Sequence, residues 1–238
     1  MDIQVIRIQG NSFSVSVDGT NIGRILCYKN PSHLRNTYLS MELSVYIPEF
    51  SQALFSLLQE HIGSTMQMML SSEETDMIKF LEQGGFRCVR RCFEGEYSWN
   101  DLRDFVQQSL PLNVANFESD EYQACAILLF SQYRAKHESI NPLTDSFQVF
   151  QAALPHTVLW YGKENVIQHF AFVEENEIAY VGSIEKTQYP AFINSVVSHL
   201  FSHYKTISFE ADDNDWEAMT LRSLFRNTTS NSFHTYIR

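Results

Sequence analysis

Alternating apolar and polar residues mark the first patterned stretch of the chain, FSVSVDGTNIGRILCYK, which starts at Phe13. The alternation predicts two strands, and Asp18 followed by Gly19 predicts a tight turn between them. Further along, SSEETDMIKFLEQGG places acidic and hydroxyl residues ahead of apolar residues at helical spacing. This order predicts a helix with acids in its first turn and an end at Gly84 and Gly85. The next stretch, FRCVRRCFEGEYS, is rich in aromatic and β-branched residues and predicts a strand.

Two cysteines in that predicted strand, Cys88 and Cys92, are spaced like a metal or redox pair. In a strand this spacing puts them on one face about 13 Å apart, too far for one metal ion or one disulfide bond. The chain has four cysteines, and its first residues, MDIQVIRIQGNSFSV, lack the pattern of a secretory signal. We therefore expect buried thiols rather than a disulfide framework.

The same order of patterns occurs twice along the chain, once over residues 13–96 and again over residues 156–236. Each stretch predicts a strand hairpin, a third strand, an amphipathic helix, a short buried strand, a second helix and a final strand. Few residues are identical between the two stretches, so the repeat is one of pattern and order. Seven patterns in one order indicate two copies of one architecture.

Three further helices are predicted between the copies, over WNDLRDFVQQSL, DEYQACAILLFSQYRAKH and TDSFQVFQAAL. Asn141-Pro142 and Leu154-Pro155 predict breaks in this region. Because these helices precede the second hairpin, we assign them to the second copy. The predicted domains are residues 1–96, which begin directly with strands, and residues 97–238.

Composition limits the function classes. The chain has 238 residues, of which 44% are hydrophobic and 19% charged, as in globular domains. A net charge of -11 and an isoelectric point near 5.1 argue against a broad nucleic-acid-binding surface. No apolar stretch approaches 18 residues, so no transmembrane helix is expected. These features predict a cytoplasmic protein that binds neither nucleic acid nor membrane.

The predicted order of elements resembles that of the GNAT acetyltransferase superfamily. The segment KFLEQGGFRCVRRCFE is similar to the helix-to-strand segment that ends in Gly-Phe near the C-terminus of many such domains. The resemblance covers nearly the whole chain. It implies an α/β (α+β) fold with two mixed sheets flanked by helices, in tandem, each sheet splayed between its fourth and fifth strands. It also implies that acyl-coenzyme A would lie in the splay.

The resemblance further implies a donor site in the second copy. Family members hold the pyrophosphate on a Gln/Arg-x-x-Gly-x-Gly/Ala loop at a helix start, where small residues let backbone N–H groups approach the phosphates. In QYPAFI, Gln188 and Ala191 fit this pattern, whereas Ile193 replaces the second small residue and Pro190 lacks an N–H. The first copy has IPEFSQAL at this place, with no glycine. The residues implied for acetyl-CoA binding are Val181, Gly182, Ser183 and Ile184 along the pantetheine arm, and Gln188, Ala191, Phe192 and Ile193 at the pyrophosphate.

The usual general acid of the family is a tyrosine in the following helix. In DWEAMTLR, Asp215, Ala218 and Leu221 are in register with the family pattern, but Arg222 stands in the tyrosine position, and Leu81 stands there in the first copy. Arginine does not donate its proton at neutral pH, although it stabilises a thiolate electrostatically. Arg222 is therefore the candidate for that role.

Glu177 and Tyr180 lie where family members often place the residue that deprotonates the amine. Glu177 would act as a general base, and the alternative is an ordinary carboxylate at the start of a strand. His199 and His203 have the spacing of a metal pair, but no third ligand follows, and we interpret them as a polar helix flank. No metal site is expected.

The resulting hypothesis is an N-acetyltransferase in which a small-molecule or peptide amine attacks the thioester of acetyl-CoA directly. The acidic composition favours a cationic amine. The alternative is a catalytically inactive scaffold of the same fold that binds a ligand or a protein. The oligomeric state is open, and a homodimer is one alternative.

Overall fold

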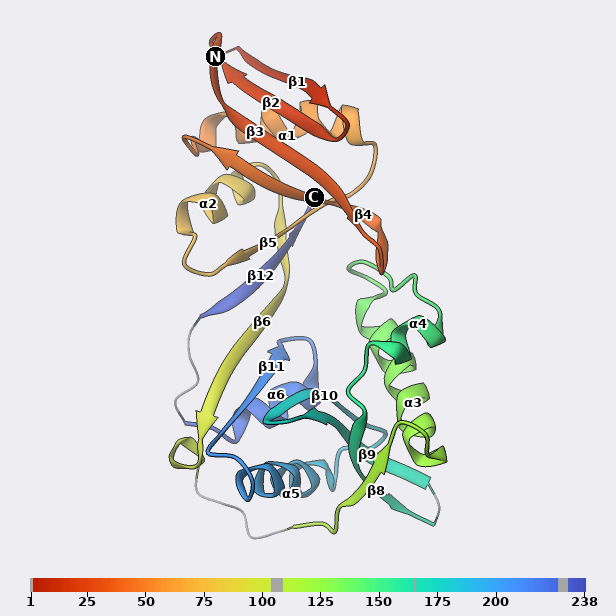
Figure 1. The fold of residues 1–238 in the computed structure, drawn as a ribbon. Helices are drawn as coiled ribbons and strands as arrows, with labels where there is room; N and C mark the ends of the chain where they lie inside the picture. Colours follow the sequence, from red (N-terminus) through yellow and green to blue (C-terminus); the bar gives the residue numbers. More distant parts are fainter. Residues whose placement is uncertain (1, 104–108, 165, 227–230) are drawn as a thin grey trace. The chain divides into compact units, whose positions relative to one another are not determined.

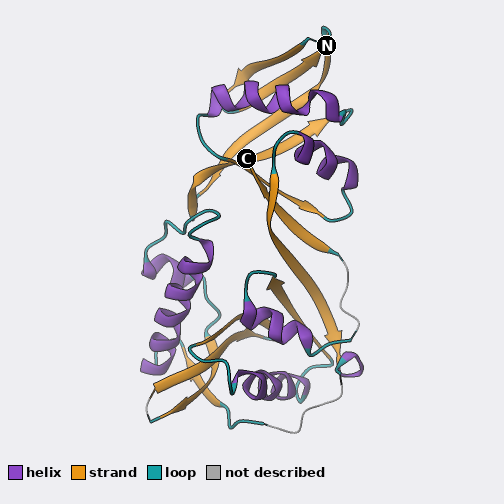
Figure 2. Cartoon of the chain, turned by 180° about the vertical axis from the view of Figure 1, so that it is seen from behind, coloured by secondary structure: helices purple, strands orange, loops and turns teal. Residues whose placement is uncertain are grey.

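The computed structural model describes residues 2–103, 109–164, 166–226 and 231–238 (Figures 1 and 2). Its contacts divide the chain into two compact units. Unit 1 comprises residues 1–91, 137–144 and 233–238, and unit 2 comprises residues 92–136 and 145–232.

Unit 1 is a mixed sheet with two helices. In the order in which they lie side by side, its strands are β1 (Ile3–Gln9), β2 (Ser12–Val17), β3 (Thr20–Asn30), β4 (His33–Leu43), β5 (Met66–Ser71) and β12 (Ser232–Ile237). The helices α1 (Pro48–Ile62) and α2 (Thr75–Gln83) cover one face of this sheet (Figure 2). Phe50, Leu54 and Phe55 of α1 and Phe80 of α2 are buried there in one apolar core with the strands.

Three local predictions are confirmed. Asp18 and Gly19 both have positive φ, 48° and 80°, as the tight hairpin turn between β2 and β3 requires. Gly85 follows α2 at φ 87°, in the left-handed region that ends many helices. Cys88 and Cys92 both lie in β6 (Arg87–Ser98), and neither is in a disulfide bond among the described residues.

The segment of residues 137–144 also belongs to unit 1, and Asn141 fixes it there. The Asn141 side chain is buried, accepts a hydrogen bond from the backbone N–H of Asn36 and donates to Gln67 Oε1 at 3.2 Å. Asn36 donates to the same oxygen at 2.9 Å. These hydrogen bonds satisfy amide groups whose burial would otherwise be costly.

Unit 2 repeats the sheet with helices on both of its faces. Its strands, in spatial order, are the second part of β6, β11 (Thr206–Asp212), β10 (Glu177–Ser183), β9 (Val166–Glu174), β8 (Thr157–Lys163) and β7 (Asn113–Asn116). One face packs on α5 (Tyr189–Phe201) and α6 (Trp216–Ser223) through an apolar core that includes Phe192, Val196 and Leu221. The other face contacts α3 (Asp120–His137) and α4 (Phe147–Ala152), for example through the ring contact of Tyr122 with Phe172.

The helix predicted over WNDLRDFVQQSL is wrong in its described part. Trp99–Asp101 form a single 3-10 turn, because the Asp101 carboxylate accepts hydrogen bonds from both the backbone N–H and the hydroxyl of Ser98. Leu102 is then extended and buried. Residues 104–108 of the predicted helix lie outside the described residues, and β7, which follows, was not predicted.

Both sheets are splayed between their fourth and fifth strands, as the resemblance implied. In unit 1, β4 and β5 run parallel and pair only at Thr37 with Met66 and Tyr38 with Gln67. In unit 2, β10 and β11 pair only at Glu177 with Ser208 and Ile178 with Phe209. The seven elements of the predicted repeat recur in order, from β2 to β6 and from β8 to β12.

The last strand of each copy pairs with a strand of the other copy. Residues 233–238 group with unit 1, where β12 pairs antiparallel with β5, and residues 92–98 group with unit 2, where β6 pairs antiparallel with β11. The ranges 1–96 and 97–238 stay a prediction about which residues fold together. Within the described part of the chain, no helix is both long and apolar enough to cross a membrane.

Candidate functional site

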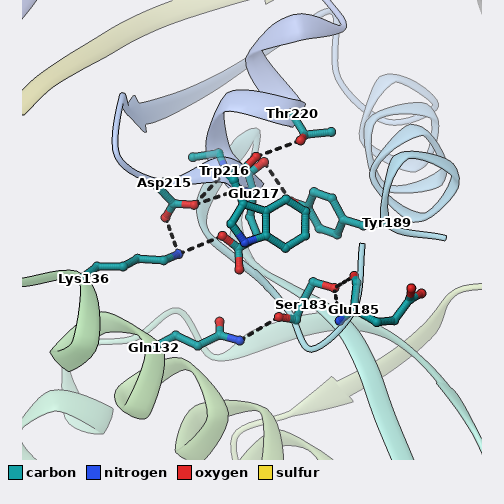
Figure 3. A network of polar contacts seen from close by, with 10 residues as sticks. Gln132, Lys136, Ser183, Glu185, Tyr189, Asp215, Trp216, Glu217 and Thr220 are labelled. Carbon is teal, nitrogen blue, oxygen red and sulfur yellow. Dashed lines mark hydrogen bonds and ion pairs between the residues drawn. The ribbon is translucent and has the colours of Figure 1, made fainter. Parts of the chain in front are cut away.

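The splay of unit 2 exposes one edge of β10 to side chains from other elements. Strand β10 pairs with β9 as far as Ser183, which lies opposite His169. Its pairing with β11 ends at Ile178. The backbone N–H of Ile184 donates to Gln168 of β9, so the alternation of a strand turns the backbone groups of Ser183 toward the splay. The Ser183 carbonyl accepts a hydrogen bond of 2.9 Å from Gln132 Nε2 of α3 (Figure 3). A side-chain amide therefore already binds this edge.

A carboxylate lies at the start of α5. Glu185 Oε2 accepts from the backbone N–H of Thr187 at 2.6 Å, and Oε1 accepts from that of Gln188 at 3.1 Å. Burial by itself would raise the Glu185 pKa, but the backbone donors of Gln188 and Thr187, together with His169, outweigh it and lower the pKa. Glu185 is therefore ionised at neutral pH and satisfies donors that a helix start offers to an anion.

His169 connects this carboxylate to the end of β10. The imidazole is fully buried, its Nδ1 lies 2.7 Å from Ser183 Oγ, and its Nε2 lies 3.2 Å from Glu185 Oε1. The Ser183 hydroxyl also donates to the Glu185 carbonyl (Figure 3). Burial lowers the His169 pKa, and the nearby Glu185 offsets only part of this effect. The imidazole is therefore neutral, and its contact with Ser183 fixes the ring beside Glu185.

A partly buried ionic cluster lies beside the same splay, at the start of α6. Lys136 Nζ of α3 contacts Asp215 Oδ2 at 2.6 Å and Glu217 Oε2 at 3.1 Å (Figure 3). Asp215 is also the N-cap of α6, since its Oδ1 accepts from the backbone N–H of Glu217 and of Ala218. The Glu217 side chain is 3% exposed. Burial raises its pKa to about 7, and the hydrogen bond with Asp215 adds to the rise, while Lys136 opposes it.

Aromatic rings close this cluster toward α5. The ring of Tyr189 meets that of Trp216 edge-on at 5.1 Å, and its hydroxyl donates to the Glu217 carbonyl at 3.1 Å. Lys186 Nζ lies 5.1 Å from the centre of the Trp216 ring. Burial, followed by the nearby carboxylates of Glu217 and Asp215, raises the Tyr189 pKa well above its ordinary value. Tyr189 is therefore a structural phenol rather than a base.

An acidic groove of about 450 Å³ opens where the pairing of β10 with β11 begins. We call it the acidic groove, and its lining residues are Glu94, Gly95, Glu96, Glu177, Ser208, Phe209 and Glu210. Four of these residues are glutamates and none of the lining residues is cationic. Burial raises the Glu210 pKa, and Glu94 and Glu177 add to the rise, so the groove holds closely spaced negative charge.

Tyr180 is the phenol nearest to this charge among the predicted residues. Its ring lies 6.4 Å from that of Tyr133 and 6.5 Å from that of Phe150, on the face covered by α3 and α4. Burial raises its pKa, with further contributions from Glu210 and Glu177. Tyr180 therefore stays protonated at neutral pH and offers a donor, not a base.

The structure brings together Glu177 and Tyr180 but places Arg222 elsewhere. The Arg222 guanidinium lies on α6, with its carbon 3.9 Å from the centre of the Phe93 ring. Helix α6 packs on the opposite face of the sheet from Tyr180. The catalytic roles of these three residues stay predictions.

The residues predicted to hold the donor lie along the end of β10 and the start of α5. Ser183 and Val181 are buried and Ile184 is half exposed, while an added Cβ on Gly182 would lie 2.5 Å from Gln132 Oε1. Gln188 is the N-cap of α5 and Ala191 lies in its first turn. The side chains of Phe192 and Ile193 are fully buried in the core, and the backbone N–H of Phe192 already donates to the Gln188 carbonyl.

Sequence reasoning missed Gln132, Lys136, Glu185 and Glu217. Lys136 and Glu217 are 81 residues apart, and nothing in the local pattern of α3 singles out its polar residues. The signal available for Glu185 was its place, an acid three residues before the N-cap of a predicted helix. His199 and His203, singled out by their spacing, have rings 5.1 Å apart, with His199 in the last turn of α5 and His203 in the turn that follows it. Within the described residues no three potential metal-binding side chains gather.

Comparison with known proteins gives the fold. No protein-family model and no curated protein matches the sequence. Among solved structures, a GCN5-related N-acetyltransferase from Sphaerobacter thermophilus is similar, with a TM-score of 0.53 and 11% identity over 98% of this chain and 82% of that protein. A conserved protein of unknown function and probable N-acyltransferase from Enterococcus faecalis V583 gives a TM-score of 0.52 and 10% identity over 95% of this chain. This chain spans 61% of the length of that second protein. The splayed sheets, the order of elements and these similarities together identify the fold as that of the GNAT acetyltransferases.

Proposed function

We propose that unit 2 is an N-acyltransferase that moves an acyl group from an acyl-CoA thioester, such as acetyl-CoA, to a cationic amine. The observation that carries this proposal is the acidic groove, which adjoins the splay of a GNAT fold and has four glutamates among its lining residues. Clustered carboxylates in a concave site raise the local concentration of a cation and favour its binding. The acceptor would therefore be an amine with further positive charge, either small or on a peptide.

Glu177 is the best-placed base for that acceptor. It lies in the groove, at the residue where β10 begins to pair with β11. An alkylammonium must lose a proton before its nitrogen forms a bond to the acyl carbon, and that proton would pass to Glu177 directly or through water. The carbon–sulfur bond then breaks, and the leaving thiolate takes up, directly or through water, the proton that the new amide nitrogen loses. Tyr180, which stays protonated, would act only as a hydrogen-bond donor.

The residues of unit 2 fit one part of an acyl-CoA better than the other. The edge of β10 beyond Ile178 is not paired with β11, so its backbone groups suit the amide groups of a pantetheine arm. The start of α5 does not suit a pyrophosphate, because Glu185 already accepts from Thr187 and Gln188. The chemistry that the bound thioester would supply is its activated acyl group.

A second candidate is a catalytically inactive unit that binds a cationic ligand. The occupied groups of the splay favour it, since Gln132 already binds the Ser183 carbonyl and Glu185 already caps α5. Both candidates use the acidic groove. They differ in whether a thioester is consumed.

The test is release of thiol from acetyl-CoA in the presence of an amine panel that runs from 1,4-diaminobutane to lysine peptides. We expect turnover with diamines, and a loss of about 10²–10⁴ in kcat for Glu177→Gln. Glu210→Gln would chiefly raise the KM for the amine, because it removes binding charge. Glu118→Gln is the matched control, since it removes the same charge from an exposed residue outside the groove. If calorimetry detects amine binding but no thiol is released, the result contradicts the acyltransferase and supports the catalytically inactive unit that binds a cationic ligand.

A further inference from the structure

The start of α5 in unit 2 is filled by the chain's own carboxylate. Backbone N–H groups at a helix start favour anions. Here both Glu185 oxygens accept such groups, from Thr187 at 2.6 Å and from Gln188 at 3.1 Å. Pro190, in the first turn, has no N–H to offer. The Glu185 side chain is 31% exposed, so this place is open to solvent and within reach of a ligand.

A buried imidazole nitrogen is aimed at the same place. His169 is fully buried, and among the described residues its Nε2 has no hydrogen-bond partner, although it lies 3.2 Å from Glu185 Oε1. Its Nδ1 is engaged by Ser183 Oγ at 2.7 Å, which fixes the ring. Two backbone donors therefore hold a single negative charge beside a buried imidazole nitrogen that has no hydrogen-bond partner among the described residues. The backbone donors make this place suited to an anion.

We propose that Glu185 determines the donor specificity of unit 2, as an internal carboxylate that occupies the place of a donor phosphate. The inference rests on the proposed function. A pyrophosphate at this helix start would have to displace the carboxylate or lie against it, and like charges at such distances repel. A pantetheine arm is neutral and would meet the edge of β10 instead. Unit 2 thus recognises an acyl thioester through its pantetheine arm and its acyl group. The nucleotide part of CoA contributes little to binding.

The test is binding by titration calorimetry, with the full chain and three probes: inorganic pyrophosphate, CoA and pantetheine. Glu185→Gln keeps the length of the side chain and one acceptor oxygen but removes the charge. We expect this variant to bind pyrophosphate and CoA at least about tenfold more tightly than the wild type, with pantetheine unchanged. Glu118→Gln, which changes the net charge equally, should leave all three affinities unchanged.

The outcomes separate this inference from the proposed function. No gain for either phosphate probe in Glu185→Gln, or an equal gain in Glu118→Gln, overturns the role of Glu185. A higher affinity for pyrophosphate in Glu185→Gln, with no acyl transfer from acetyl-CoA or acetyl-pantetheine in any variant, contradicts the proposed enzyme. The role of Glu185 in excluding phosphate would still stand. Glu185→Ala, which removes both charge and cap, must show the same gain as Glu185→Gln. Circular dichroism confirms that each variant is folded.

Discussion

Glu217 makes the stability of unit 2 depend on pH in a direction opposite to that of most carboxylates. Burial raises its pKa from 4.5 to about 7, even though Lys136 lies 3.1 Å away. Because the folded state binds this proton more tightly than the unfolded state, the stabilising contribution is present below the unfolded pKa. It is lost as the pH rises through the folded pKa. A shift of this size corresponds to about 3 kcal/mol, most of which falls between pH 5 and pH 8.

The perturbation is Glu217→Gln, which resembles the protonated side chain and still offers an oxygen to Lys136. We expect the variant to gain stability relative to the wild type by about 2–3 kcal/mol between pH 5 and pH 8. Guanidinium unfolding at four pH values measures this difference. Tryptophan fluorescence follows the unfolding, and one of the three tryptophans, Trp216, adjoins Glu217 and packs on Tyr189 at 5.1 Å.

Glu118→Gln is again the control, since it removes a carboxylate that is exposed. Its unfolding free energy should follow that of the wild type across the whole range. Parallel curves for Glu217→Gln and the wild type would refute the reasoning, because they would mean that folding does not change the proton affinity of Glu217. If Glu217→Gln instead loses stability relative to the wild type as the pH rises, the attraction of Lys136 lowers the Glu217 pKa by more than burial raises it.

Three further changes test the packing around the site and the hairpin of unit 1. Lys136→Met leaves two carboxylates without their cation and should cost about 3–5 kcal/mol at pH 8, and less at pH 5, by denaturant unfolding. Gly182→Ala puts a Cβ 2.2 Å from the Phe170 ring and 2.5 Å from Gln132 Oε1, so a melt should show a loss of about 1–3 kcal/mol. Gly19→Ala has open space around its Cβ but φ 80°, and should cost about 1 kcal/mol, with Gly19→Asn costing less. An unchanged melting temperature in either glycine variant would contradict the conformation described for that residue.

Local structure could be predicted because it depends on interactions between residues that are close together in the sequence. The turn at Asp18 and Gly19 and the helix end at Gly85 follow from backbone conformations that few residues adopt. The strand that contains Cys88 follows from its aromatic and β-branched composition. The element order of the two copies is the sum of such local preferences. A short amphipathic stretch was the exception, where the Asp101 carboxylate closes one turn and Leu102 continues extended.

The site could not be predicted in the same way, because its contacts join residues that are far apart. Gln132 reaches Ser183 across 51 positions and Lys136 reaches Asp215 across 79. A polar residue on a helix has the same pattern whether it faces water or a buried carboxylate. Only the packing of α3 on the sheet distinguishes these cases.

The sequence by itself determined the seven elements of each copy and their order, together with a resemblance that implied the splay. Tertiary structure alone decided which strand pairs with the last strand of each copy, so that β12 lies beside β5 and β6 lies beside β11. It also decided that Glu185 fills the start of α5. The physical reason is that backbone hydrogen bonds between strands, and the burial of charge, depend on which surfaces meet. A pattern of apolar residues shows which face of an element is buried, but it does not show which other element packs against that face.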